Sequence, residues 1–334
     1  MNTKHLVAGA MALIVPSALC LTGCQFGLFN SFNYKYDNGD KYTAGDRDIS
    51  EKVTKVNIDY ISGNVKVKGT DADTVFIRET SNKAIDDDHK VHTWVDDGTL
   101  YVRYCASTNM INFTGIEKEL EITLPGSQEL DDFIIDISSG NTDISGITTD
   151  SLNSHASSGN VNIDCSAEVI ELKVSSGNID LKQTGDNQSV NVKSSSGKVN
   201  FTQVGTSNSV SIDSSSGGVT ANVDRIDKMY VHVSSGKIYV EGNDIADLTS
   251  KASSGHCDFK LKNAPMTADI NSSSGGVSVY VPENSDVTVN VSIASGEFNY
   301  DLPFAKNGKT YVAGNGTSDM KIHSSSGDVD FMKI

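Results

Sequence analysis

The chain is 334 residues long and acidic, with 27 Lys and Arg against 43 Asp and Glu and a formal net charge of −16 at pH 7. This balance argues against nucleic acid or an anionic lipid surface as the partner, because both need a basic footprint. It allows cations, basic peptides or basic surfaces, and it equally serves to keep a β-rich exported protein in solution. Only five prolines, and no helical periodicity after the first residues, favour an all-β fold.

Residues 1–23 have the pattern of a lipoprotein signal peptide. A basic start at Lys4 precedes an apolar run over 6–21, and the run ends in Leu-Thr-Gly-Cys at 21–24, which resembles the bacterial lipobox. The resemblance implies cleavage before Cys24 and lipidation of its thiol, with two or more acyl chains needed for stable anchoring. An ordinary signal peptide or a membrane span is the alternative, although a span needs about 20 apolar residues.

Residues 24–50 show no clear periodicity and are predicted to be a tether between lipid and fold. From Val53 apolar and polar residues alternate. The apolar residues stand at the same distances from Gly63 as they do from the glycines of the repeats described below, so this segment is predicted to be a first, degenerate repeat. Further strands are predicted at 74–80, 91–96, 99–105 and 119–125, and Asp97-Gly98 is typical of a hairpin turn. Because terminal repeats must close the open core of a solenoid, residues 51–130 are predicted to form an N-terminal β cap.

The predicted cap also contains an acidic loop with two histidines. These residues are Asp86, Asp87, Asp88, His89 and His92. Carboxylate and imidazole groups are common metal ligands, and a solvated loop is the alternative. The sequence leaves open whether Asp86–Asp88 bind a cation, and it predicts no other metal and no cofactor.

The tripeptide Ser-Ser-Gly, once Ala-Ser-Gly, recurs through residues 131–334. Its glycines are Gly140, Gly159, Gly177, Gly197, Gly217, Gly236, Gly255, Gly275, Gly296 and Gly327. The steps between them are 18 to 21 residues, except for the last step of 31. Such spacing is typical of a solenoid, in which each repeat buries its apolar face against its neighbours.

Each repeat alternates apolar and polar residues on both sides of its glycine. Apolar residues stand two and four positions after it, as in Val161 and Ile163, and seven and five before it, as in Ile170 and Leu172. This period of two indicates strands with one buried face. The sequence therefore predicts a parallel β-solenoid, or β-helix, of coils of ~20 residues stacked about 4.8 Å apart. Its handedness and oligomeric state are left open.

The glycine suits a corner because it reaches positive φ without a clash of Cβ. The serine before it, such as Ser216, is predicted to point inward and to form a ladder of hydroxyls from coil to coil. A catalytic role for these serines has no support, because the chain contains no G-x-S-x-G elbow and active sites do not occur in ten copies.

Three cysteines remain after the signal peptide and Cys24. Cys165 and Cys257 fall on inward positions five corners apart, about 24 Å along the stack, which is too far for a disulfide. Together with Cys105 they form no C-x-x-C motif, so a zinc or redox site has no support. His155 and His232 share one outward position and are interpreted as surface residues.

The repeats resemble the bacterial putative-adhesin family, a β-helical domain found in many surface lipoproteins. The resemblance rests on the Ser-Ser-Gly corners followed by Asn or Lys and Val or Ile, and on segments 41–46, 56–65, 119–125 and 314–316. It covers about residues 41–334 and implies an extracytoplasmic β-solenoid, with no catalytic residues to carry over. Some relatives are linked to envelope-stress sensing of cationic peptides, which is compatible with the acidic charge.

We therefore predict a non-enzymatic surface lipoprotein, anchored to the bacterial cell membrane through lipid on Cys24. Its role would be adhesin-like binding, or envelope structure and stress, with a glycan, the cell wall, a protein or a cationic peptide as partner. The alternative is a carbohydrate-active β-helix enzyme such as a polysaccharide lyase. Those enzymes use longer coils and a local Asp cluster with Arg or Lys, whereas the arginines here are scattered. They are Arg47, Arg78, Arg103 and Arg225.

Overall fold

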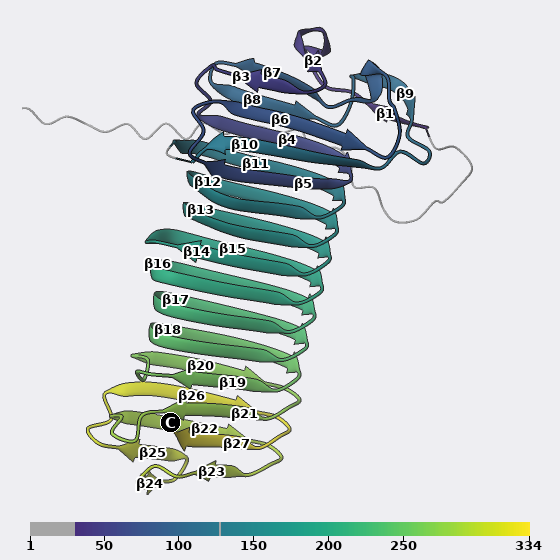
Figure 1. Cartoon of the computed structure of the whole chain (residues 1–334). Coiled ribbons are helices and arrows are strands. Elements are labelled where there is room, and N and C mark those ends of the chain that lie inside the picture. The colour runs from purple at the N-terminus through teal and green to yellow at the C-terminus, as the bar shows by residue number, and fades with distance from the viewer. Residues whose placement is uncertain (1–30, 127) are drawn as a thin grey trace, which may run out of the picture.

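The computed structural model describes residues 31–126 and 128–334. Within this part the chain forms a 25-stranded sheet that winds along one long axis, and a 2-stranded sheet at the N-terminal end (Figure 1). The all-β, solenoid-like class predicted from the sequence is confirmed. None of the described helices is long and apolar enough to cross a membrane. The predicted signal peptide and Cys24 lie outside the described residues.

The central coils stack in parallel and in register, as the repeat predicts. Their strands are β11 (Glu129–Ser139), β12 (Thr142–Ser158), β13 (Val161–Ser176), β14 (Ile179–Thr184), β15 (Asn187–Ser196), β16 (Val199–Ser216), β17 (Val219–Ser235) and β18 (Ile238–Ser254). Between β16 and β17, for example, Val210 pairs with Met229 and Ser216 with Ser235. The apolar positions that flank the corner glycines are buried and form one continuous core along the axis, except after Gly296, where Phe298 is half-buried and Tyr300 is exposed.

The ten corner glycines form a column in which neighbouring backbones touch. Their φ angles lie between +121° and +146°, a region that side chains with a Cβ rarely adopt. At Gly217 the N–H donates to the Ser235 carbonyl at 2.9 Å. A Cβ on Gly217 would lie 1.9 Å from the carbonyl oxygen of Gly197. The corner therefore needs glycine both for its φ and for the close approach of the next coil.

The predicted inward ladder of corner serines is wrong. All ten serines that directly precede a corner glycine are exposed, and they are Ser139, Ser158, Ser176, Ser196, Ser216, Ser235, Ser254, Ser274, Ser295 and Ser326. The buried position lies three residues before the glycine, where Ser272 and Ser324 donate to the carbonyls of Gly275 and Gly327 at 2.9 Å. Strict alternation ends there because the chain turns, so two consecutive residues face solvent.

The last repeat in the sequence is not the last coil of the stack. β26 (Ser318–Ser324) lies between β20 (Thr267–Ser272) and β22 (Val287–Ile293), and β27 (Val329–Lys333) pairs with β21 (Val277–Val281) and β23 (Phe298–Tyr300) (Figure 1). The remaining strands here are β19 (Cys257–Leu261), β24 (Ala305–Asn307) and β25 (Thr310–Ala313). The long step before Gly327 thus holds the terminal coil and the antiparallel β24–β25 hairpin, which covers the end of the core.

The N-terminal end of the stack, like the C-terminal end, is closed by strands that pair antiparallel. These are β1 (Ser31–Tyr34), β2 (Thr43–Ala44), β3 (Arg47–Ile49), β4 (Lys55–Ser62), β5 (Asn64–Thr70), β6 (Val75–Ser81), β7 (His92–Asp96), β8 (Thr99–Arg103), β9 (Thr108–Asn112) and β10 (Lys118–Pro125). Two 3-10 turns, η1 (Gly39–Lys41) and η2 (Asp87–His89), connect them. β4 and β5 form the first coil, β8 and β10 stack on it in parallel, and β7 and β6 follow antiparallel. Short antiparallel strands prevent further stacking on an edge.

The tether predicted for residues 24–50 differs from the structure. Residues 31–49 contribute β1, β2 and β3 to the cap, with Tyr34 and Ile49 buried. The sequence carries no signal for this because these strands have two to four residues, too few for alternation to be visible.

Cys165 and Cys257 offer a direct test of the strand faces. Both thiols are buried, and burial raises the pKa of each to about 12. We expect neither to react with a thiol reagent at about pH 8 in the native chain, because the thiolate is scarce and shielded, and both to react in urea. Labelling followed by mass spectrometry measures this, and rapid native labelling of both would contradict the buried placement.

Candidate functional site

The acidic loop of the cap does not converge on a common point. Asp86 caps η2, with its side chain 2.5 Å from His89 Nδ1, and Asp87 pairs with Lys90 at 2.7 Å. His92 is buried, with its Nδ1 2.9 Å from the Lys90 carbonyl. The described residues contain no group of three or more His, Cys, Asp or Glu suited to a metal ion. The structure thus gives no support to a cation site here.

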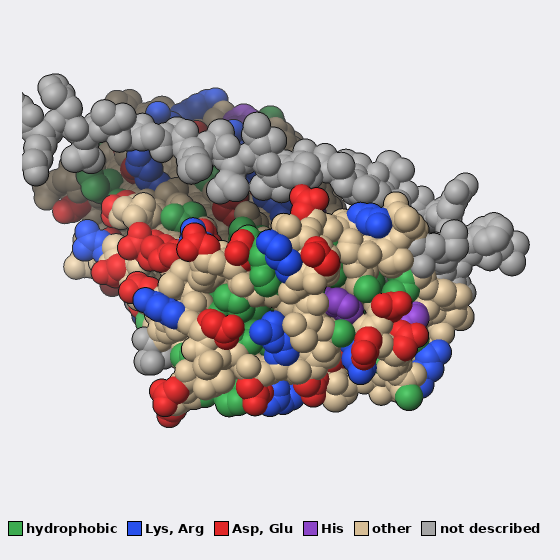
Figure 2. Space-filling view, turned by 90° about the horizontal axis from the view of Figure 1, so that it is seen from above, with side chains coloured by type: hydrophobic (Ala, Val, Ile, Leu, Met, Phe, Trp, Pro, Cys, Tyr) green, Lys and Arg blue, Asp and Glu red, His purple; other side chains and the backbone are tan. Residues whose placement is uncertain are grey.

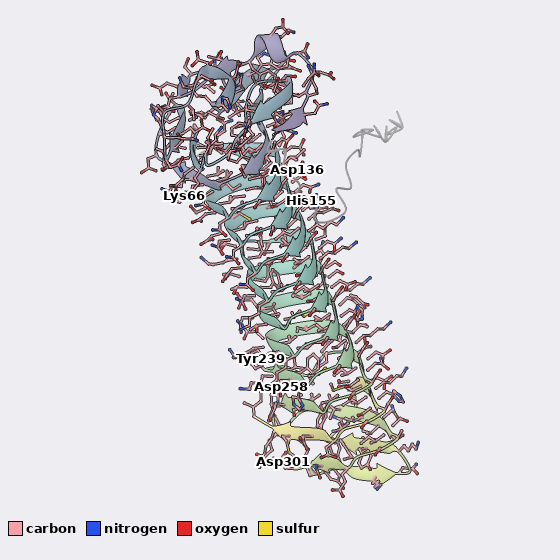
Figure 3. The ribbon with its side chains drawn as sticks, turned by 90° about the vertical axis from the view of Figure 1, so that its right-hand side faces the viewer. Lys66, Asp136, His155, Tyr239, Asp258 and Asp301 are labelled. Carbon is pink, nitrogen blue, oxygen red and sulfur yellow. The ribbon has the colours of Figure 1, made fainter. Side chains whose placement is uncertain are left out.

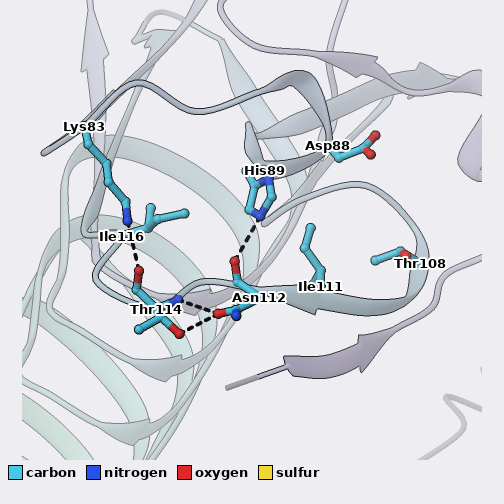
Figure 4. A pocket seen from close by; sticks show the side chains of 8 residues that line it. All are labelled: Lys83, Asp88, His89, Thr108, Ile111, Asn112, Thr114 and Ile116. Carbon is cyan, nitrogen blue, oxygen red and sulfur yellow. Dashed lines mark hydrogen bonds between the residues drawn. The ribbon is translucent and has the colours of Figure 1, made fainter. Parts of the chain in front are cut away.

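A pocket of about 400 Å³ opens beside this loop (Figure 4). Its lining residues are Lys83, Asp88, His89, Thr108, Ile111, Asn112, Thr114 and Ile116. Several of its polar groups bind one another: His89 Nε2 lies 3.0 Å from the Asn112 carbonyl, and Lys83 Nζ donates to the Thr114 carbonyl at 2.9 Å. These groups serve to hold the loops together.

A buried ion pair lies at the base of the cap. Lys118 Nζ and Glu79 Oε1 are 2.7 Å apart, and the two side chains are 0% and 4% exposed. The ammonium also donates to the carbonyls of His89 and Tyr104 at 2.6 Å. Burial lowers the pKa of Lys118, and the Glu79 carboxylate opposes that change. The pair is almost fully buried and therefore holds the structure rather than a ligand.

Three partly exposed aromatic residues lie next to one another on the side of the cap, and we call them the aromatic ladder: Tyr42, Trp94 and Tyr101. Trp94 and Tyr101 face each other across β7 and β8 with ring centroids 5.6 Å apart and an interplanar angle of 23°. Tyr42 lies 5.6 Å from Trp94 with the two rings tilted by 57°, and Lys41 Nζ lies 4.9 Å from the centre of the Trp94 ring. Tyrosine and tryptophan combine apolar area with a polar tip, so such a surface suits recognition.

A column of ionisable side chains runs beside the aromatic ladder and down the solenoid. In stack order this charged column is Arg103, Asp59, Asp136, His155, Lys173 and Lys193, each in register with the next. Asp136 lies 3.7 Å from His155. Burial raises the pKa of Asp59 and of Asp136. Figure 3 shows Asp136 and His155 on one side of the stack just below the cap, and Lys66 on the other side.

A groove of about 340 Å³ lies along this column. It is lined by Ile134, Asp136, Asn153, His155, Glu171, Leu172, Lys173, Asn191 and Lys193. The cross-strand row that contains Trp94 and Tyr101 continues into the groove through Asn57, Ile134, Asn153, Glu171 and Asn191. The aromatic ladder, the charged column and this groove therefore form one continuous surface, which we call the side strip.

The end of the molecule carries a mixed surface. Figure 2 looks onto the cap, where acidic and basic side chains lie interspersed with hydrophobic and polar ones. Sequence reasoning missed the side strip because Trp94 and Tyr101 come from cap strands outside the repeat, and it interpreted His155, together with His232, only as a surface residue. The available signal was the pair of outward aromatic residues flanking the Asp97-Gly98 hairpin.

The structure defines a capped β-solenoid of stacked coils with a candidate binding surface along one side. The sequence profile of the Toastrack DUF4097 family matches residues 53–168 and 164–331. These matches span most of the chain, and the protein belongs to this family. No curated protein matches it.

Several solved structures match this chain at low sequence identity and low TM-score. A putative adhesin from Parabacteroides distasonis ATCC 8503 is 14% identical, with a TM-score of 0.43, and the match covers 90% of this chain and 100% of that one. A putative lipid binding protein from the same organism is 15% identical, with a TM-score of 0.42 and coverage of 71% and 96%. A putative adhesin from Parabacteroides merdae ATCC 43184 is 11% identical, with a TM-score of 0.35 and coverage of 91% and 99%. At these scores the likeness carries no functional argument.

Proposed function

We propose that this protein is a non-enzymatic surface lipoprotein, held at the bacterial cell membrane by lipid on Cys24, which binds an extracellular ligand through the side strip. The observation that carries the proposal is the continuity of the side strip. Partly exposed aromatic residues and a polar groove share one cross-strand row, so an extended ligand would contact all of them at once. Trp, Tyr and Arg, the residues that dominate binding energies at protein interfaces, all occur at its cap end.

A carbohydrate-active enzyme is the competing proposal. The carboxylates best placed for acid or base chemistry are Asp59 and Asp136, whose pKa values burial raises. Asp136 is nevertheless exposed on an open side of the stack, and catalysis gains most from groups preorganised in a site that excludes water. We therefore assign these carboxylates to binding.

An array of glycans and purified bacterial cell walls tests the proposed function with the full chain solubilised in detergent. We expect saturable binding to at least one of these materials and no release of soluble sugar. Failure to bind any of them would refute binding of glycans and of the cell wall. Turnover of a polysaccharide that is lost in Asp136→Asn would instead establish the enzyme.

The lipid anchor makes a separate prediction. Cys24→Ala removes the thiol that would carry the acyl chains, so the precursor should stay unprocessed by the lipoprotein pathway and leave the membrane fraction. Fractionation of cells after a high-salt wash, with Cys105→Ala as the control, measures this. Cys24→Ala that still partitions with membranes would show that lipidation at this residue is not what holds the protein there.

A further inference from the structure

We propose that the side strip binds a linear glycan with anionic substituents, lying parallel to the axis of the stack. This inference rests on the proposed function and specifies the class of ligand. Three features carry it, namely the spacing of the coils, the aromatic ladder, and a pair of lysines at the far end of the groove.

The spacing of the side strip suits a chain of sugars. Each coil adds one side chain to the row, with a step of about 4.8 Å, and a pyranose in an extended glycan has about the same length. Asn57, Asn153 and Asn191 occur in this row, and an amide both donates to and accepts from hydroxyls. From Trp94 to Asn191 the row has six steps, or about 29 Å. An extended peptide fits less well, because side chains on one of its faces repeat every ~6.6 Å.

The aromatic ladder supplies apolar contact at the cap end of the side strip. Trp94 and Tyr101 are each partly exposed, and the C–H groups of a sugar ring pack well on aromatic surface. The Tyr101 hydroxyl and the Trp94 indole N–H provide polar tips beside this apolar area.

The groove contains the carboxylates Asp136 and Glu171 as well as Lys173 and Lys193, and the two lysines at its far end are the feature that favours an anionic group on the ligand. They are direct neighbours in register, and like charges directly opposite each other are destabilising in a sheet. Neither takes part in an ion pair within the described part of the chain; the next carboxylate in the column, Asp213, pairs with His232 at 3.1 Å.

The charges at the cap end of the column are arranged differently. Asp59 and Asp136 also adjoin, but Arg103 and His155 flank them. A carboxylate or phosphate on the ligand would bridge the two free ammonium groups of Lys173 and Lys193 with charge-assisted hydrogen bonds. A basic peptide would be repelled at this point.

Trp94 is the only tryptophan of the chain, so its fluorescence reports directly on the side strip. The probe is polygalacturonate, titrated into the full chain in detergent, with its carboxyl-reduced form as the uncharged control. We expect saturable quenching of Trp94 by the carboxylated polymer, at least tenfold weaker binding of the reduced one, and loss of affinity with added salt. Poly(glycerol phosphate), a polyanion without sugar rings, tests whether charge alone is sufficient, and binding as tight as that of polygalacturonate would overturn the assignment to a glycan.

The double variant Lys173→Gln/Lys193→Gln should weaken binding of polygalacturonate at least tenfold. The matched control is Lys182→Gln/Lys260→Gln, which removes the same net charge from exposed lysines that follow a corner glycine, on the other side of the stack. Equal weakening by both double variants, or equal binding of the charged and reduced polymers, would overturn the proposal. Binding to cell walls without binding to either polyanion would reject the anionic glycan while the proposed function stands. If only vesicles of brominated lipid quench the fluorescence of Trp94, the aromatic ladder binds a membrane and not a glycan.

Discussion

Gly217→Val is expected to destabilise the centre of the solenoid strongly. The φ of this residue is +126°, and the added Cβ would lie 1.9 Å from the carbonyl oxygen of Gly197 in the neighbouring coil. Strained backbone costs about 1–3 kcal/mol, and overpacking against atoms that cannot move costs about 1–3 kcal/mol more. We therefore expect the free energy of unfolding to fall by about 2–6 kcal/mol. Urea unfolding followed by far-UV circular dichroism measures it.

Ser216→Val is the matched control, because it adds the same side chain one residue earlier. Ser216 is exposed, and surface substitutions of this kind usually change stability by less than about 0.5 kcal/mol. In a solenoid, stability is close to a sum of nearest-neighbour terms, so damage at Gly217 should also divide the unfolding transition in two. Equal midpoints for the two variants would refute the stacked glycine column.

The coils themselves are predictable from the sequence. Val161, Ile163, Ile170 and Leu172 are buried where period-two alternation places them, because a one-residue shift would expose every apolar side chain of a strand. The corner was harder to predict. A turn lets two consecutive residues face solvent, and alternation alone does not show where it stops.

The order of the coils could not be predicted from the repeat. Each corner presents the same glycine, the same hydrogen bonds and similar apolar neighbours, so a coil is able to stack on almost any other. The preceding 31-residue step lets the coil of Gly327 enter beside that of Gly275, while the coil of Gly296 ends the stack. The β24–β25 hairpin covers the coil of Gly296, where its Tyr311 packs on Phe298 with ring centroids 4.6 Å apart.

The side strip depends on the same geometry. Its residues are far apart in sequence, from Tyr42 to Lys193, and only the stacking of cap strands on the first coil brings them into one row. Regular stacking thus explains both the stability of the solenoid and its suitability for an extended ligand. The irregular cap supplies the cluster of aromatic residues, whereas the row below the groove holds a single one, Tyr230, next to Ser211.

Lys118→Met is expected to destabilise the cap by about 3–5 kcal/mol, the usual result of removing one partner of a buried ion pair. The Glu79 carboxylate would keep its hydrogen bonds from the Tyr60 hydroxyl at 3.0 Å and the Val91 N–H at 2.8 Å, but its charge would be uncompensated. The main chain of Lys118 also packs on Gly63 in the way that neighbouring corners pack on each other along the stack. A Cβ added to Gly63 would lie 2.1 Å from the Lys118 carbonyl oxygen. Trp94 fluorescence during urea unfolding reports on the cap alone.

The double variant Lys118→Met/Glu79→Gln separates charge from packing. The glutamine that replaces Glu79 is neutral, and its carbonyl oxygen is still able to accept from the Val91 N–H, so no buried charge remains without a partner. Neutral replacement of a buried pair often costs little, and we expect the double variant to recover at least about half of the stability lost in Lys118→Met. The circular dichroism transition of the central coils should stay in place in both, since they do not contact the pair. A double variant less stable than Lys118→Met would show that the ion pair is not what Lys118 contributes to the cap.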